Sequence, residues 1–246
     1  MILGIILLVL ILILIFRDIV VKLIKGKKLS FLRAKKIITK EYKIHDVTNK
    51  KLVIDVLDTD VKILFDKHIN EINVKTMYLI EEFSYDVSYD RENISIERNN
   101  RENYKKLGNS GRILIKIPEK SIINDLNILI TNGDVEIYDT NINNMVIKGD
   151  NGVVKIDSLN AKNINIFKSH GEVNLSHVNL NTLKLDIKDG NGDFVDVYGE
   201  NINVKVVNGD FVFANVCEED YKIDFLKVNT LNGKQKLNVN ANVLCE

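Results

Sequence analysis

A short phrase recurs through the second half of the chain and constrains its fold more than any other feature. Each copy has an Asn-Gly pair, or a close variant of it, followed by a run in which apolar and polar residues alternate. The intervals between the glycines of successive copies are 19, 19, 21, 17 and 24 positions, and these glycines are Gly133, Gly152, Gly171, Gly192, Gly209 and Gly233. A spacing this regular indicates a structural repeat, whose units stack because one unit alone cannot bury its apolar face.

The residues on both sides of each glycine alternate with a period of two. Five and seven positions before the glycine every residue is apolar, from Leu126 and Ile128 in the first copy to Leu226 and Val228 in the last. Two and four positions after the glycine, ten of twelve residues are apolar. Alternation rich in β-branched residues predicts half-buried strands, and glycine tolerates the positive φ of a tight turn. Each repeat is therefore predicted to be two short strands joined at its glycine.

Two all-β architectures fit such a repeat. In a meander of hairpins, the residue three positions before the glycine would face the residue two positions after it and should be apolar. Half of the residues at that position are polar or charged, and the six are Ile130, Gly149, Lys168, Asp189, Val206 and Thr230. A solenoid coil places no such demand there. The sequence therefore favours an all-β fold in which about six repeats of roughly 20 residues form a β-solenoid, like a single-stranded β-helix.

The repeats occupy residues 121–246 in this interpretation, and residues 41–120 show a different pattern. Segments such as 52–56 and 113–117 have a period of two and alternate with polar turns, but no phrase recurs. Terminal units of repeat proteins are atypical because one of their faces has no neighbouring repeat. We therefore expect residues 41–120 to form a strand-rich N-terminal cap on the solenoid.

Residues 1–40 differ from the rest of the chain in hydropathy and charge. Residues 2–16 are almost entirely apolar, and the apolar character continues far enough to supply the about 20 residues that a membrane-spanning helix needs. Residues 1–40 carry a net charge of +8, so residues 41–246 carry −8. We predict a transmembrane anchor over 1–24 and a basic juxtamembrane segment over 25–40. Candidate contacts with anionic lipid headgroups are Lys22, Lys25, Lys27, Lys28, Arg33, Lys35 and Lys36.

An aspartate follows the glycine in three of the six repeats. If the repeats stack, Asp134, Asp193 and Asp210 would form a row at one corner of the solenoid. Such a row could coordinate Ca²⁺. Alternatively, each carboxylate could simply accept a hydrogen bond from the turn backbone. Other residue types interrupt the row, so we favour the structural role and expect no metal site there.

The remaining candidate residues give no indication of catalysis. His170 and His177 share one repeat but have no metal-spaced partner, and Cys217 and Cys245 are interpreted as free thiols. The sequence contains no GxSxG, HExxH or P-loop motif and no dinucleotide-binding fingerprint. We therefore expect no cofactor and no enzymatic activity. The acidic balance of residues 41–246 argues against binding to nucleic acid.

The order of these features carries a resemblance to a known family. A strand-rich first half, the element Ile115-Lys116-Ile117-Pro118 and then the glycine repeats resemble the family of bacterial envelope proteins called putative adhesins, a domain of unknown function. This family often follows a single transmembrane helix. The resemblance implies a solenoid-like β domain at the cell envelope, connected with adhesion or envelope stress, and it offers no catalytic residues.

The expected function is that of a membrane-anchored, non-enzymatic interaction module of a bacterial cell membrane. Its partners would be the membrane and an unidentified protein or glycan. The alternatives are a glycan-binding or glycan-cleaving solenoid and a tethered module that assembles into a homo-oligomer or polymer. All basic residues near the anchor follow it, which slightly favours a cytoplasmic β domain, whereas the resemblance favours the outer side.

Overall fold

The computed structural model describes residues 37–45, 50–79, 81–98, 111–119, 121–215 and 223–245. They belong to one compact unit, Ile37–Glu246. The predicted anchor and the basic residues predicted to contact lipid lie outside the described residues, as does Cys217. Within the described ranges, no helix is long and apolar enough to cross a membrane.

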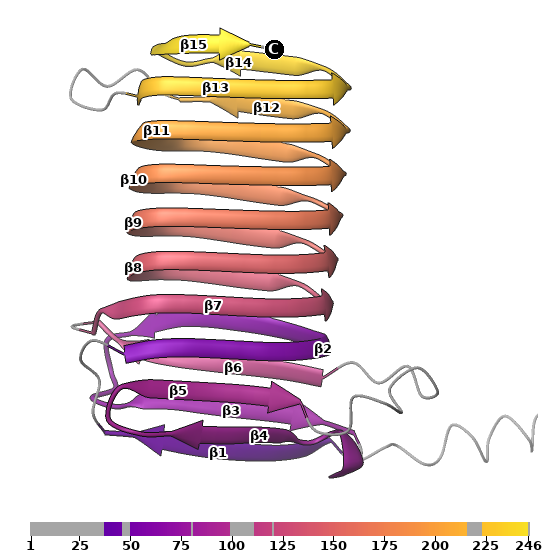
Figure 1. Cartoon of the computed structure of the whole chain (residues 1–246). Coiled ribbons are helices and arrows are strands. Elements are labelled where there is room, and N and C mark those ends of the chain that lie inside the picture. The colour runs from indigo at the N-terminus through magenta and orange to yellow at the C-terminus, as the bar shows by residue number, and fades with distance from the viewer. Residues whose placement is uncertain are drawn as a thin grey trace, which may run out of the picture. The chain divides into compact units, whose positions relative to one another are not determined.

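The described unit is all-β, as predicted, and its strands stack into a β-solenoid (Figure 1). The strands and the short 3-10 turn η1 are β1 (Ile38–Ile44), β2 (Lys50–Asp66), β3 (Ile72–Tyr78), η1 (Glu81–Phe83), β4 (Tyr85–Tyr89), β5 (Asn93–Arg98), β6 (Gly111–Pro118), β7 (Ile123–Asn132), β8 (Val135–Asn151), β9 (Val154–His170), β10 (Val173–Asp189), β11 (Gly192–Asn208), β12 (Phe211–Ala214), β13 (Ile223–Asn232), β14 (Gln235–Asn238) and β15 (Ala241–Cys245).

The repeats pair in parallel, one coil on the next. β8, β9, β10 and β11 are each 17 residues long. Each residue pairs with the residue 19 positions further on, so that Val154 lies between Val135 and Val173. A hairpin meander would give antiparallel pairs between neighbours in sequence. The parallel register therefore confirms the solenoid.

Each coil has two layers and two corners. We call the residues that precede a corner glycine the front layer, such as 142–151 in β8, and the residues that follow it the back layer, such as 135–138. The first corner is at the glycine, as predicted. The second corner was not predicted: it is marked by four residues at regular intervals with φ between 50° and 58°, namely Asp139, Ser158, His177 and Asp196.

One predicted corner glycine was wrong: the corner is at Gly190 and not at Gly192. Positive φ occurs at evenly spaced glycines, which are Gly133, Gly152, Gly171, Gly190 and Gly209. Gly192 is instead the first residue of β11, in register with Val173 and Phe211. A Cβ atom at Gly190 would lie 1.8 Å from the Gly171 carbonyl oxygen, so the stacked corners exclude larger residues. Gly233 stacks on Gly209 in the same way, and the longer interval before it includes residues 216–222.

The residue three positions before the corner glycine faces the core, contrary to the reasoning used against hairpins. Ile130, Ile187 and Val206 are buried there. With the register corrected, Asp189 no longer belongs to this row. Lys168 does, and only 4% of its surface is exposed. The hairpin was rejected correctly, but the two polar residues that remain at this position, Lys168 and Thr230, have buried polar atoms and do not face outward.

The N-terminal part combines parallel coils with antiparallel strands. β2 forms a full coil, although it precedes the repeats in sequence by many residues. It pairs in parallel with β5 and β6 on one side and with β7 and β8 on the other. Beyond it, β1 and β3 extend the back layer through β6, and β4 extends the front layer through β5, with antiparallel pairing. These antiparallel strands form the N-terminal end of the domain (Figure 1).

The core is a continuous stack of apolar side chains between the two layers. Most coils contribute Ile, Val or Leu at the inward positions. Near the C-terminal end the stack changes to aromatic rings, with Phe194 contacting Phe211 and Phe213 edge to face at centroid distances of 5.0 and 5.3 Å. Such contacts add to the free energy gained by burying the rings.

Candidate functional site

Amide side chains at the glycine corner form hydrogen bonds from coil to coil. In four of the six coils the residue before the corner glycine is an asparagine that takes part: Asn151 Nδ2 donates to Asn132 Oδ1 at 2.7 Å, and Asn232 Nδ2 donates to Asn208 Oδ1 at 2.8 Å. Asn208 in turn donates to Asp189. These residues are therefore occupied in holding the coils in register.

Aspartates of the predicted acidic row accept hydrogen bonds from backbone N–H groups of the next coil. Asp134 Oδ1 accepts the Val153 N–H and Asp210 Oδ1 accepts the Lys234 N–H, both at 2.8 Å. Asp193 is not in the row, because it lies within β11 and pairs with Asn174 in β10. Among the described residues, no group of three or more His, Cys, Asp or Glu side chains is placed to hold a metal ion. The carboxylates at this corner support the coils, as the structural interpretation expected.

The two histidines of one repeat contact different carboxylates. His177 Nδ1 lies 2.9 Å from Asp157 Oδ1, and this hydrogen bond raises the pKa of His177 above 6.5. His177 Nε2 faces Asp196 Oδ2 at 3.9 Å. His170 Nε2 lies 3.4 Å from Asp189 Oδ2. A catalytic triad would place a hydroxyl nucleophile at the second imidazole nitrogen, but at His177 that nitrogen faces a carboxylate.

A buried polar network joins β2 to the N-terminal strands. Arg98 Nη1 donates to the Asp58 carbonyl oxygen at 2.7 Å, and the Thr59 and Tyr85 hydroxyls lie 2.8 Å apart. Burial raises the pKa of Tyr85. Lys50 is fully buried and donates to the carbonyl oxygen of Asp90 at 2.8 Å. Sequence reasoning missed these residues, because an Arg or Lys inside a period-two segment gives no sign of burial.

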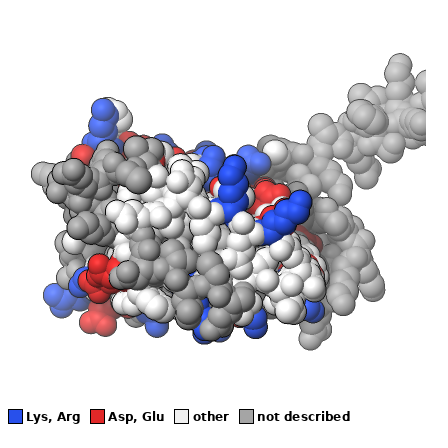
Figure 2. All heavy atoms as spheres, turned by 90° about the horizontal axis from the view of Figure 1, so that it is seen from above, with Lys and Arg blue, Asp and Glu red and all other residues white. Residues whose placement is uncertain are grey.

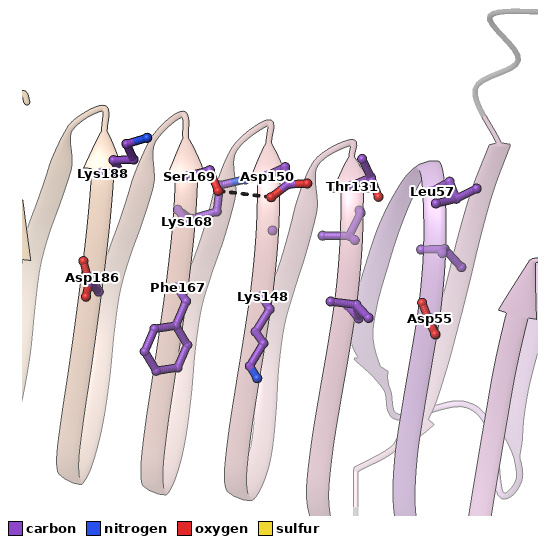
Figure 3. A pocket seen from close by; sticks show the side chains of 14 residues that line it. Asp55, Leu57, Thr131, Lys148, Asp150, Phe167, Lys168, Ser169, Asp186 and Lys188 are labelled. Carbon is purple, nitrogen blue, oxygen red and sulfur yellow. Dashed lines mark hydrogen bonds between the residues drawn. The ribbon is translucent and has the colours of Figure 1, made fainter. Parts of the chain in front are cut away.

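A groove of about 410 Å³ crosses the outer surface of the front layer (Figure 3). Two rows of side chains line it, one from each of two outward positions of successive coils. The row four positions before the corner holds Asp55, Leu129, Lys148, Phe167 and Asp186, and the row nearer the corner holds Leu57, Thr131, Asp150, Ser169 and Lys188. Ser169 donates to Asp150 at 3.0 Å. The groove therefore brings together an aromatic ring, aliphatic side chains and charges of both signs.

Lys168 belongs to the same coils but lies beneath the surface. Its stem fills space left by Gly149, since a Cβ atom there would be 3.0 Å from Lys168 Nζ. No hydrogen-bond partner for that nitrogen is found among the described residues. Burial lowers the pKa of Lys168, while the carboxylates of Asp150 and Asp134 act in the opposite direction.

Comparison with known proteins identifies the family. The sequence matches the family Toastrack DUF4097 over residues 49–225. A comparison with curated protein sequences finds no match. Among solved structures, a putative adhesin from Bacteroides fragilis NCTC 9343 is similar, with 18% identity, a TM-score of 0.52 and coverage of 86% of this chain and 97% of that chain.

Two further solved structures cover similar shares with lower scores. One is a putative lipid binding protein from Parabacteroides distasonis ATCC 8503, with 10% identity, a TM-score of 0.41 and coverage of 85% of this chain and 97% of that chain. The other is a putative adhesin from Parabacteroides merdae ATCC 43184, with 11% identity, a TM-score of 0.36 and coverage of 86% and 96%. The family match extends over most of the chain, and the β-solenoid agrees with it: this protein belongs to the Toastrack family DUF4097.

Proposed function

We propose that this protein is a non-enzymatic interaction module, held at a bacterial membrane by its N-terminal segment, and that the front layer is its working face. The observation that carries the proposal is a contrast between the side chains at the corners and those on the outer surface of the front layer. Those at the corners are engaged in bonds between coils, whereas Lys148, Phe167 and Lys188 project from the outer surface at one groove.

The sequence supports the membrane anchor. An apolar run of the length of a bilayer is followed by a basic segment, and basic residues next to a transmembrane helix favour the cytoplasmic side. We therefore propose a single-pass protein with its β domain on the cytoplasmic face. The lysines and the arginine of the basic segment would contact anionic headgroups there.

Fractionation and labelling test the anchor and its orientation. The full chain should resist extraction from membranes at alkaline pH, and a chain without residues 1–24 should be soluble. For orientation, exposed Lys162 is replaced by Cys in a chain whose two native cysteines are Ser. A membrane-impermeant thiol reagent should label this variant only after permeabilisation. Labelling of intact cells would place the domain outside.

Crosslinking tests the working face. A photoreactive amino acid at Phe167 should give crosslinks in cells, and the same amino acid at Asp193 in the back layer should not. Crosslinks from Asp193 alone would contradict the choice of face, and absence of crosslinks from both would contradict an interaction module.

A second candidate function is end-to-end assembly, and one observation favours it. In the described sheet, β14 pairs with β12 and β15 pairs with β13, with no strand beyond either of them. Open strand edges can pair with another chain. Filaments or dimers of the β domain at micromolar concentration would support this function, and a monodisperse monomer would contradict it.

A further inference from the structure

The two outer surfaces of the solenoid differ in charge. We compare outward strand positions over the coils from β8 to β14. In the front layer these positions hold six lysines against four carboxylates: Lys148, Lys162, Lys184, Lys188, Lys205 and Lys227 against Asp150, Asp186, Glu200 and Asp224. In the back layer they hold two lysines against three carboxylates: Lys155 and Lys236 against Glu136, Asp157 and Asp193. Figure 2, which looks along the domain from the C-terminal end, shows charged side chains of both signs around its outline.

Four lysines of the front layer are spaced apart from one another on its outer surface. Lys148 and Lys205 lie in the same row as Phe167, and Lys184 and Lys188 lie on either side of that row in β10. With about 4.8 Å between strands and about 3.3 Å per residue, each pair is roughly 13–14 Å apart. None of these four lysines pairs with a carboxylate within the part of the chain that the structure describes, and Lys184 Nζ lies 5.4 Å from the Phe167 ring centroid.

Exposed apolar side chains share this surface. Leu129 is 49% exposed, Phe225 43% and Leu231 69%, and all three occupy outward positions of the front layer. Phe225 and Leu231 lie on the same outward face of β13, two strands from Lys184 and Lys188 in β10. Lysines that attract anionic headgroups, together with apolar groups that enter the interface, are the combination by which peripheral surfaces bind membranes.

We propose that the front layer binds the surface of an anionic lipid bilayer. Lys184, Lys188 and Lys205 contact headgroup phosphates, and Phe225 and Leu231 enter the interfacial region. An acidic glycan is the competing ligand, since it could use the lysines and the Phe167 ring. The lipid surface is favoured because Phe225 and Leu231 lie away from the Phe167 ring, at the C-terminal end of the front layer. A glycan bound at Phe167 would not cover these two apolar side chains, whereas a bilayer surface would. The proposal rests on the proposed function in taking the front layer as the working face.

Vesicle binding of residues 37–246 tests the proposal without the anchor. This unit contains the described core, and the similar Bacteroides structure consists almost entirely of the matching domain. It should bind vesicles of equal parts phosphatidylcholine and phosphatidylglycerol, and bind vesicles of phosphatidylcholine alone far more weakly. Each lysine contributes about fivefold to the affinity, so the triple variant Lys184→Gln, Lys188→Gln, Lys205→Gln should bind roughly a hundredfold more weakly.

The matched control is Lys155→Gln with Lys236→Gln in the back layer, which should keep the affinity of the native fragment. Circular dichroism melts establish that all variants are folded. Absence of binding to the anionic vesicles, or equal losses in the front and back variants, would overturn the proposal. Front-layer-dependent binding to hyaluronate without binding to vesicles would overturn it in favour of an acidic glycan. Because the fragment lacks residues 1–36, failure here is separate from failure of the anchor.

Discussion

Replacing Lys168 with methionine should stabilise the β domain, although lysine is the native residue. The amine is buried, and none of the described residues hydrogen-bonds to it. An unsatisfied buried polar group costs about 1–3 kcal/mol, and methionine keeps an unbranched stem of similar length without the amine. A domain of this size gains about 2–4 °C in Tm per kcal/mol. We therefore expect Lys168→Met to raise the Tm of residues 37–246 by about 2–12 °C at pH 7, measured by scanning calorimetry.

The pH dependence gives a second measure of the same effect. Burial lowers the pKa of Lys168 in the folded state below its ordinary value of 10.5. As the pH rises through the window between the lowered value and 10.5, the folded protein releases this proton before the unfolded chain does. The stability of the native protein therefore rises relative to that of the variant. The advantage of Lys168→Met should be largest near neutral pH and shrink toward pH 10.5.

Lys162→Met is the matched control, because Lys162 is exposed, and its Tm should equal that of the native protein. The reasoning would be refuted if Lys168→Met melted below the native protein. It would also be refuted if the advantage of the variant were the same at every pH, since the gain would then come from packing and not from removing a buried amine.

Three further measurements follow from the described contacts. Gly190→Ala should cost about 3 kcal/mol or more, because φ is 150° and a Cβ atom would lie 1.8 Å from a backbone oxygen. Gly192→Ala should cost less in the same thermal melts, because its Cβ atom would meet a phenylalanine ring that can shift; equal losses would contradict the corrected register. The pKa of His177, measured by NMR titration, should exceed 6.5, and a value at or below 6.5 would show that the bond to Asp157 is absent in solution. Because this pKa is raised on folding, the stabilisation should be complete below pH 6.5 and be lost as the pH rises through the folded-state value. Phe194→Ala should lower the free energy of unfolding in urea by about 3–5 kcal/mol because it leaves a cavity beside the rings of Phe211 and Phe213. A loss below about 1 kcal/mol would show that neighbouring side chains fill this cavity.

The repeat and the corner glycine could be predicted because both leave a periodic signal. Strand alternation marks the inward residues, and glycine is required where the corners of successive coils approach within van der Waals distance. Gly192 was wrongly assigned to a corner because it belongs to an Asn-Gly-Asp sequence like those at other corners, although it breaks the constant interval between glycines. A strictly constant interval between corners selects Gly190 and also places Ile187 and Phe194 on the core face.

The second corner and the buried lysine left weaker signals. The four residues at the second corner are two aspartates, a serine and a histidine, so no single recurring residue marks the left-handed backbone there. Burial of Lys168 depends on its neighbour one coil earlier, since the missing side chain of Gly149 provides the space for the lysine stem. The groove combines residues from five coils, and its lining follows from the coil register, which becomes predictable only after the corners are correctly assigned.

The place of β2 between later strands determines the order in which the domain can be completed. Asp58 pairs with Asn132, 74 residues further along the chain, so a growing chain presents β2 long before any parallel neighbour exists. When β5, β6 and β7 follow, they enclose it on both sides, and each later coil then adds to a finished one. The C-terminal coils can therefore open one at a time without disturbing those beneath them. Release of β2 would instead separate β6 from β8 and divide the stack in its interior.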